Sequence, residues 1–268
     1  MNNHIGSFPK YLIYILGSLF ILIFAYLEIK VLHYNEPAKN RHPYRITNNH
    51  TDTIKIGYIG DSWAELHMKH PCQIAEAIKS TINRPVIMES FGISGFTSKE
   101  IYNSFFDNFN FKVFLEEGFD YCVISAGIND TNQKRSPSYY TNSMDCIIQF
   151  MLSNKIHPII IEIPDYDIDK AYEIQKKYKM FIRDIYMYIT RYPKNCKDIF
   201  RKSLSDLIEK KGYGNKVSII RYKSWNNNYR KDISTLYQDD GVHLNNTGYN
   251  KLDHQIAQTI CEIIIANK

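Results

Sequence analysis

A serine, Ser62, stands directly after a short apolar run in the stretch "IKIGYIGDSWAEL", residues 54–66. A serine hydroxyl is a weak nucleophile unless a neighbouring base, normally a histidine, takes its proton. His243 supplies such a base in "DDGVHLN", and Asp240 precedes it by three residues on the same loop. A carboxylate that holds one imidazole nitrogen fixes the tautomer of the ring and stabilises the imidazolium. These three residue types predict a nucleophile, a base and an orienting acid for acyl transfer.

The tetrahedral intermediate of acyl transfer also needs preorganised hydrogen-bond donors, each typically worth about 3 kcal/mol. Two further stretches offer them, "SFGISGFTS" at 90–98 and "AGINDTN" at 126–132. A glycine allows a backbone N–H to approach a ligand closely. The candidate donors are therefore the N–H groups of Ser62 and Gly95 and the side-chain amide of Asn129.

Taken singly, each of these residues has a plain structural interpretation. Ser62 can cap the following helix, and Asn129 with Asp130 can form a turn. His67 and His70, three residues apart, suggest a metal site, but further ligands at suitable spacing are missing from the sequence around them. We therefore interpret this histidine pair as a surface turn and expect no metal and no cofactor.

Short apolar runs alternate with helical patterns from residue 54 onward. The runs are rich in valine and isoleucine and apolar on both faces, as strands of a covered parallel sheet are; they are 54–60, 85–90, 120–127, 157–164 and 216–222. Helical spacing follows at 71–82, 97–107, 137–153, 168–190, 197–211 and 247–266. This alternation predicts an open α/β fold with helices on both faces of a parallel five-stranded sheet. Ligands of such sheets bind beyond the carboxyl ends of the strands, which is where the candidate residues fall.

In order along the chain, these residues resemble the four sequence blocks of the SGNH (GDSL-type) hydrolases: Gly60-Asp61-Ser62, Gly95, Gly127-Ile128-Asn129-Asp130 and Asp240-x-x-His243. The resemblance covers about residues 54–266. It implies a flavodoxin-like three-layer αβα domain that hydrolyses or transfers esters without metal or cofactor. It also implies that Ser62 is the nucleophile, His243 the base and Asp240 its orienting acid. Ser62, Gly95 and Asn129 would form the oxyanion hole.

Two departures from the family pattern touch no catalytic role. Trp63 follows the serine where a smaller aliphatic residue is common and is expected to narrow the acyl pocket, and Ser90-Phe91 replace a common asparagine. Four further aromatic residues are expected near the mouth of the crevice, where they either stack on sugar rings or pack ordinarily: Tyr139, Tyr140, Tyr166 and Trp225.

The N-terminal region differs in kind from the rest of the chain. Residues 11–27 carry no charge, and the apolar stretch extends to residue 32, which is long enough to span a bilayer with some tilt. We expect a short tail (1–10), a single-pass signal anchor (11–32), a polar linker (33–52) and the catalytic domain (53–268). The alternative is a cleaved signal peptide, but the apolar stretch runs into bulky residues without a small-x-small cleavage site.

The orientation of the anchor stays open. The lysines and arginines that follow it favour a cytoplasmic catalytic domain by the positive-inside rule. A short tail, an anchor and a large domain are the usual layout of an exported domain, and on that ground we expect the domain outside the cytoplasm.

Composition narrows the other possibilities. The net charge of +5 is mild and its lysines form no continuous basic face, so nucleic acid is not an expected partner. Five scattered cysteines indicate neither a disulfide framework nor a zinc site. Residues 165–215 exceed one crossover helix, and their apolar stripe indicates core or a helical hairpin that serves as a lid: Ile174, Tyr178, Phe181, Ile185 and Tyr188.

The sequence thus predicts a membrane-anchored serine esterase or O-acyltransferase. Family resemblance suggests O-acetyl groups of a surface glycan as the substrate. The first alternative is a lipid esterase or thioesterase, favoured by a long apolar pocket beside Ser62. The second is a non-catalytic glycan-binding or scaffold protein of a membrane complex, which would have no need of His243. Oligomeric state is not predicted.

Overall fold

The computed structural model describes residues 8–47, 52–70, 72–173, 181, 183–185, 187–188, 192–226 and 228–267. The chain forms two compact units, Met1–Glu36 and Pro37–Lys268. The first unit contains helix α1 (Phe8–Tyr34), and the apolar side chains along it, such as Leu16 and Phe20, are exposed. By length and composition, this helix is able to cross a membrane over Tyr11–Tyr34.

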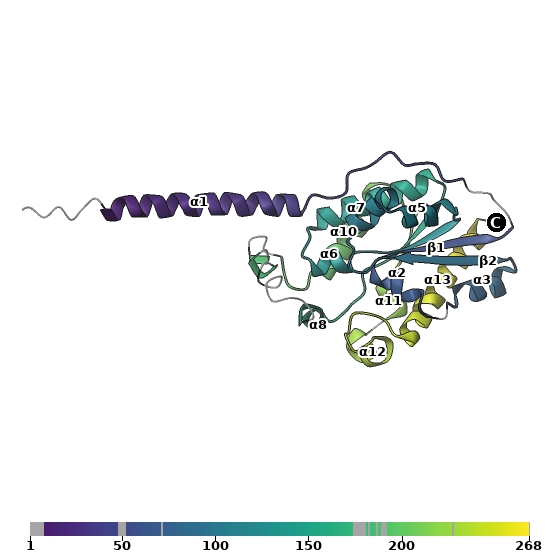
Figure 1. Ribbon diagram of the computed structural model, residues 1–268. Coiled ribbons are helices and arrows are strands. Elements are labelled where there is room, and N and C mark those ends of the chain that lie inside the picture. The colour runs from purple at the N-terminus through teal and green to yellow at the C-terminus, as the bar shows by residue number, and fades with distance from the viewer. Residues whose placement is uncertain are drawn as a thin grey trace, which may run out of the picture. The chain divides into compact units, whose positions relative to one another are not determined.

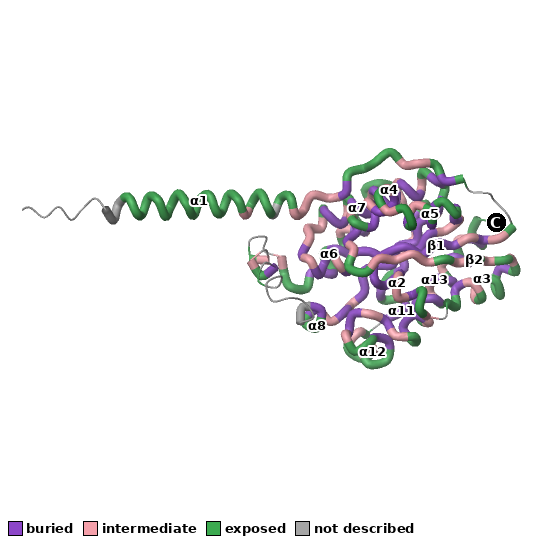
Figure 2. The backbone as a smooth tube through the Cα atoms, viewed as in Figure 1, coloured by how far each residue is buried: buried purple, intermediate pink, exposed green. Residues whose placement is uncertain are grey.

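The second unit is built on a five-stranded parallel sheet with the order β2-β1-β3-β4-β5 (Figure 1). Its strands are β1 (Ile54–Gly60), β2 (Val86–Gly92), β3 (Tyr121–Ser125), β4 (His157–Ile161) and β5 (Ser218–Ile220). The central strands are buried on both faces because helices cover both sides, which is why their residues are apolar throughout (Figure 2). The predicted three-layer α/β fold is confirmed.

Helices lie in two layers, one on each side of the sheet (Figure 1). One layer contains α4 (Ser98–Asp107), α5 (Phe109–Glu116), α7 (Pro137–Ser153) and α10 (Lys197–Lys210). The other contains α2 (Ser62–His67), α3 (Ile74–Ile82), α11 (Tyr222–Trp225), α12 (Tyr229–Leu236) and α13 (Asn246–Ala266). Two short helices, α6 (Ile128–Asn132) and α8 (Ile168–Glu173), follow strands β3 and β4. The sequence pattern missed α5, α6, α11 and α12, since helices of one or two turns carry too little periodicity to detect.

The long helix expected over 168–190 is described only in part. Helix α8 ends at Glu173, and Ile174 and Tyr178 of the expected stripe lie outside the described residues. Phe181 and Tyr188 are 66% and 87% exposed, so these two members of the stripe do not belong to the core.

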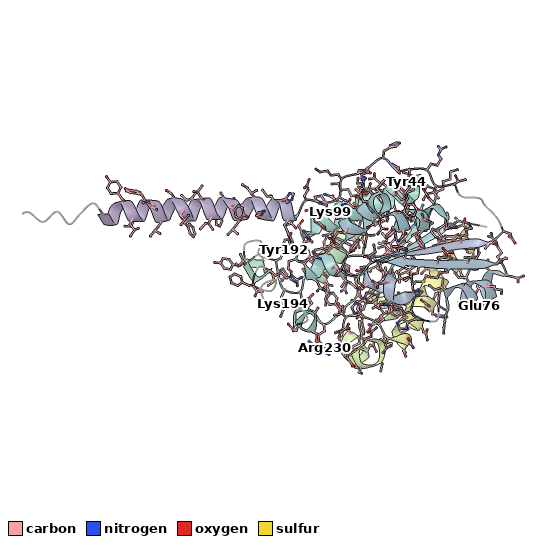
Figure 3. All side chains as sticks on the ribbon, in the orientation of Figure 1. Tyr44, Glu76, Lys99, Tyr192, Lys194 and Arg230 are labelled. Carbon is pink, nitrogen blue, oxygen red and sulfur yellow. The ribbon has the colours of Figure 1, made fainter. Side chains whose placement is uncertain are left out.

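The segment 37–47, expected to be linker, packs on the domain instead. Ala38 and Ile46 are buried, and their N–H groups donate to Ser143 Oγ (3.1 Å) and Asn154 Oδ1 (2.8 Å). Tyr44, labelled in Figure 3, packs its ring edge-on against the aromatic rings of α4 and α7. The domain therefore begins near Pro37, because apolar residues scattered through a polar stretch find partners on these two helices.

The register of the sheet aligns the carboxyl ends of β1, β2 and β3. Gly60 pairs with Gly92 on one side and with Ser125 on the other. A Cβ at Gly60 would lie 2.2 Å from the Ser125 carbonyl oxygen, so only glycine fits there. The loops that follow β1, β2 and β3 consequently leave the sheet at the same edge.

Candidate active site

Ser62 is the first residue of α2 and is not the cap of that helix. The cap is Asp61, whose Oδ1 accepts a hydrogen bond from the Trp63 N–H at 3.0 Å. The Ser62 hydroxyl is therefore free of the capping role and stands at the sheet edge, where the residue is 8% exposed.

The structure brings Ser62, His243 and Asp240 into one hydrogen-bonded row. His243 Nε2 lies 2.9 Å from Ser62 Oγ, and His243 Nδ1 lies 2.6 Å from Asp240 Oδ2. Asp240 Oδ1 also accepts the N–H groups of Val242 (2.8 Å) and His243 (2.9 Å). Partial burial alone would raise the pKa of Asp240, but the hydrogen bonds from His243 and Val242 outweigh it and hold that pKa below its ordinary value. Asp240 is thus an ionised partner for the ring at neutral pH.

Hydrogen bonds to the Gly241 carbonyl hold the loop that carries Asp240 and His243. Gly241 adopts a φ of +64°, and its carbonyl accepts the Asp167 N–H (2.9 Å) and the Tyr229 hydroxyl (2.8 Å). A Cβ at Gly241 would meet Asp167 Cβ at 2.9 Å. Contacts from α12 and from the segment after β4 therefore fix the position of the His243 imidazole.

The two expected backbone donors come from loops that leave the sheet at this same edge. Gly95, in the loop after β2, has a φ of +82° and is exposed. Among the described residues, neither its N–H nor that of Ser62 has a hydrogen-bond acceptor. Both groups are therefore available for an oxyanion.

Asn129, the third expected donor, is engaged within the protein. Its Nδ2 donates to the Phe96 carbonyl at 3.0 Å and to Asp61 Oδ2 at 3.4 Å. The first bond ties the loop after β2 to helix α6, and the second is long and weak.

Two buried carboxyl groups lie behind the site. Asp61 and Asp130 are fully buried, and burial raises the pKa of Asp61 to about 7 and that of Asp130 to about 6. Asp130 accepts the Ser98 N–H (2.9 Å) and hydroxyl (2.6 Å), which fastens the start of α4 to α6. Neither carboxyl belongs to the row of Ser62, His243 and Asp240.

The aromatic residues expected at the crevice mouth lie in the interior instead, and so does Trp63, which was expected to narrow the acyl pocket. Their exposed fractions are between 0% and 3% for Trp63, Tyr139, Tyr140, Tyr166 and Trp225. The two tryptophan rings pack edge-on at 6.0 Å, while Tyr139 and Tyr166 place their hydroxyls 2.9 and 2.7 Å from threonine Oγ1 atoms. Of the two expected roles, these rings therefore have ordinary packing: α7 carries Tyr139 and Tyr140 toward the core, α11 carries Trp225, and Tyr166 packs from the segment after β4.

Within the described part of the chain, one group of side chains has the donor types of a metal site: His67, Cys72 and Asp253. His67 Nε2 and Asp253 Oδ1 lie only 2.7 Å apart. Two ligands of one tetrahedral zinc would be roughly 3.3 Å apart, given metal–ligand bonds of about 2.1 Å. The spacing fits a hydrogen-bonded pair that joins α2 to α13, as the Gln73 N–H bond to Asp253 Oδ2 (3.0 Å) also indicates.

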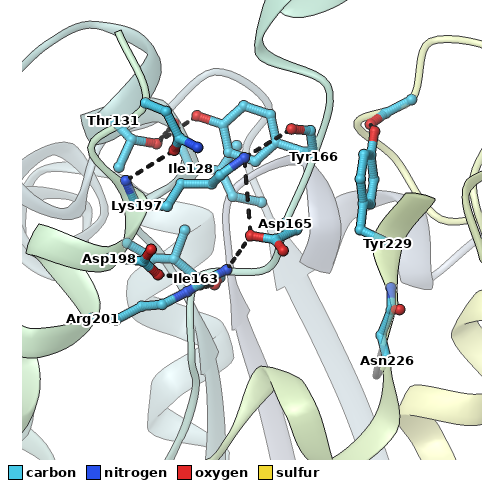
Figure 4. A network of polar contacts seen from close by, with 12 residues as sticks. Ile128, Thr131, Ile163, Asp165, Tyr166, Lys197, Asp198, Arg201, Asn226 and Tyr229 are labelled. Atoms are coloured by element: carbon cyan, nitrogen blue, oxygen red, sulfur yellow. Dashed lines mark hydrogen bonds and ion pairs between the residues drawn. The ribbon is translucent and has the colours of Figure 1, made fainter. Parts of the chain in front are cut away.

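A polar cavity of about 570 Å³ lies beside the Asp240 loop, because two of its lining residues, Asp167 and Tyr229, bond the Gly241 carbonyl. Aspartates, asparagines and basic residues line it, among them Asp167, Lys194 and Arg230. Figure 4 shows the network at its base, where Lys197 Nζ donates to the Tyr166 carbonyl (2.9 Å) and Arg201 pairs with Asp165 (2.8 Å). The sequence analysis did not identify this cavity, because its residues come from three separate stretches of the chain.

The sequence analysis did not identify Glu65 either. It lies one turn after Ser62 on α2, and its Oε2 accepts the Ser94 N–H at 2.8 Å. Its distance of three residues from the serine was the available signal, since residues three apart share a helix face.

Solved structures of esterases, lipases and acylhydrolases have a similar fold. An acetyl xylan esterase superposes with a TM-score of 0.54 at 16% identity, over 77% of this chain and 100% of its own. A lipase/acylhydrolase from Enterococcus faecalis gives 0.53 at 18%, over 78% and 96%. A GDSL-like lipase from Bacteroides thetaiotaomicron gives 0.50 at 18%, over 78% and 88%. No protein-family model and no curated protein matches the sequence. The chain thus has the α/β fold of GDSL-type hydrolases.

Proposed function

We propose that the domain 37–268 is a serine esterase or O-acyltransferase of SGNH type, with Ser62 as nucleophile, His243 as base and Asp240 as orienting acid. One observation carries the proposal: His243 bridges Ser62 Oγ (2.9 Å) and Asp240 Oδ2 (2.6 Å) at the carboxyl edge of the sheet. A scaffold protein has no use for this hydrogen-bonded row.

The reaction follows from this geometry. His243 Nε2 takes the Ser62 proton as Oγ attacks the acyl carbonyl carbon, and Asp240 stabilises the resulting imidazolium. The N–H groups of Ser62 and Gly95, with the Asn129 amide, stabilise the tetrahedral oxyanion. The imidazolium then protonates the departing alcohol and leaves an acyl ester on Ser62. Attack by water on this ester gives hydrolysis, and attack by an acceptor hydroxyl gives transfer.

The substrate that we propose is an O-acetyl group on a surface glycan. The charged and amide-rich cavity beside the Asp240 loop offers hydrogen bonds to a polyhydroxyl chain. A long acyl chain, as in the lipid-esterase alternative, would instead need an apolar lining. The likeness in fold to an acetyl xylan esterase adds a precedent for this substrate class.

We further propose that α1 anchors the domain in a membrane, with the domain outside the cytoplasm. The exposed apolar side chains of α1, uncharged over residues 11–27, support the anchor. The glycan substrate supports the orientation.

Full-length protein in detergent micelles, with Ser62→Ala as the control, tests the activity. We expect the substitution to lower kcat for p-nitrophenyl acetate by about a thousandfold or more. Acetate release from acetylated xylan should exceed palmitate release from p-nitrophenyl palmitate, and an added acceptor sugar distinguishes transfer from hydrolysis. Equal, slow cleavage by the wild type and the variant would refute the triad and favour a non-catalytic glycan-binding role.

A further inference from the structure

The loop 93–96 between β2 and α4 carries Gly95, one of the backbone donors of the candidate oxyanion hole. The residue before it, Ser94, donates its N–H to the Glu65 carboxylate at 2.8 Å. Twenty-nine residues separate the two partners along the chain, so this bond joins the loop to α2, the helix that begins with Ser62.

Close packing makes this bond possible. A Cβ at Gly92 would lie 2.1 Å from the Glu65 N atom and 2.6 Å from the Asp61 carbonyl oxygen. The end of β2 therefore runs directly against the first turn of α2. Glu65 stands one turn after Ser62, which places its carboxylate beside the loop as it leaves β2.

The carboxylate is ionised and well matched to its partner. Hydrogen bonding from the side chain and backbone of Ser94 lowers the pKa of Glu65, with smaller contributions from the charges of Lys69 and His243. A hydrogen bond from an N–H group to a carboxylate is shorter and about twice as strong as one between neutral groups. This bond is therefore a strong attachment of the loop to α2.

Gly95 needs such an attachment. Its φ of +82° and its exposure leave the backbone of the loop easily rearranged. An oxyanion donor contributes to catalysis only when it is held in place before the reaction. The Phe96 carbonyl is tied to Asn129 on the far side of Gly95, and the Ser94 N–H is tied to Glu65 on the near side.

We infer that Glu65 is a positioning residue: its hydrogen bond to the Ser94 N–H holds the loop 93–96 so that the Gly95 N–H is preorganised for the oxyanion. This inference rests on the proposed esterase function, and it adds a residue outside the row of Ser62, His243 and Asp240.

Three variants of the full-length protein test the inference by steady-state kinetics on p-nitrophenyl acetate. Glu65→Ala removes the acceptor, and kcat should fall about ten- to hundredfold with KM changed less than threefold. Glu65→Gln keeps an oxygen acceptor and should recover most of kcat. Lys69→Met is the matched control, because it removes the 3.9 Å ion pair with Glu65 but leaves the Ser94 bond; its kcat should equal that of the wild type.

Amide hydrogen exchange provides a readout that does not depend on activity. Exchange of the Ser94 amide, and of the Phe96 amide that bonds the Ile93 carbonyl within the loop (3.3 Å), should be at least tenfold faster in Glu65→Ala than in the wild type and closer to the wild type in Glu65→Gln. An unchanged kcat in Glu65→Ala, a loss confined to KM, or a Glu65→Gln variant as slow as Glu65→Ala would overturn the inference. If Ser62→Ala matches the wild type, the esterase function fails, and exchange alone then decides whether Glu65 holds the loop.

Discussion

Asp61, which stands directly before Ser62, is also expected to affect the stability of the fold. Its carboxyl caps α2 through the Trp63 N–H, yet it is fully buried. Burial raises its pKa to about 7, although the Trp63 bond opposes the shift. The unfolded chain has an aspartate pKa near 3.9. Between about pH 4 and pH 7, the folded protein therefore holds a proton that the unfolded chain has released.

This difference predicts how stability depends on pH. Because the unfolded state binds fewer protons in that window, the contribution of Asp61 to the free energy of unfolding falls as pH rises from about 4 to 7. Asp61→Asn keeps an acceptor for Trp63 but cannot ionise, so its stability should decline less steeply over the window. Burial also raises the pKa of Asp130 to about 6, so the stability of Asp61→Asn should still fall partly with rising pH. Urea unfolding at several pH values measures how the free energy of unfolding changes with pH.

The control for this prediction is Asp206→Asn. Asp206 is an exposed residue on α10 that pairs with Lys202, and its substitution should leave the slope at its wild-type value. An Asp61→Asn variant with the wild-type slope would show that Asp61 titrates near its ordinary pKa in the folded protein.

At the scale of elements, the serine depends on a helix of only six residues, α2. Such a helix is not stable alone and needs tertiary contacts. The hydrogen-bonded pair of His67 and Asp253 supplies one, since it joins the end of α2 to α13 with both side chains at most 2% exposed. Tyr249, also on α13, adds a hydroxyl bond to the Trp63 carbonyl at 3.0 Å. Helix α13 therefore holds α2, the helix that begins with Ser62, against the sheet.

Asp253→Ala should destabilise the domain by about 2–4 kcal/mol. The substitution leaves the buried His67 ring nitrogen and the Gln73 N–H without their acceptor. Urea unfolding measures the loss. Glu262→Ala, at an exposed position of the same helix that bonds only Gln258 among the described contacts, is the control and should change stability by no more than about 0.5 kcal/mol. Equal effects of the two substitutions would contradict the role given to the His67–Asp253 pair.

At the scale of the whole molecule, the boundary of the domain matters for any shortened protein. Residues 37–47 contribute the buried side chains of Ala38 and Ile46 and the packed ring of Tyr44. A chain that begins at Pro37 keeps these contacts, whereas one that begins at Thr53 loses them.

We expect the chain that begins at Thr53 to be less stable by about 2–5 kcal/mol, from the apolar surface that it leaves exposed. Comparing the urea midpoints of the two shortened chains is the measurement, and the chain from Pro37 serves as the control. Identical midpoints would show that residues 37–52 act as a linker after all, as their polar composition suggests.

The amino-acid sequence was enough to predict the α/β class, the strands and the strand ends that carry Ser62, His243 and Asp240. Apolar strands of a covered sheet are visible as local patterns, and parallel strands must bring their carboxyl ends to one edge. That rule placed the candidate residues on the same side of the sheet before any contact was known.

Only the tertiary structure decided how the serine is held. The bond between Glu65 and Ser94, the His67–Asp253 pair and the packing of residues 37–47 all join segments that are far apart in the chain. The burial of Trp63 and Tyr139 likewise depends on which way neighbouring helices face. Local periodicity cannot predict such contacts, because their free energy arises between elements and not within them. Ser62 itself shows the difference: its position follows from the strand before it, and its freedom to react follows from Asp61, which caps the helix in its place.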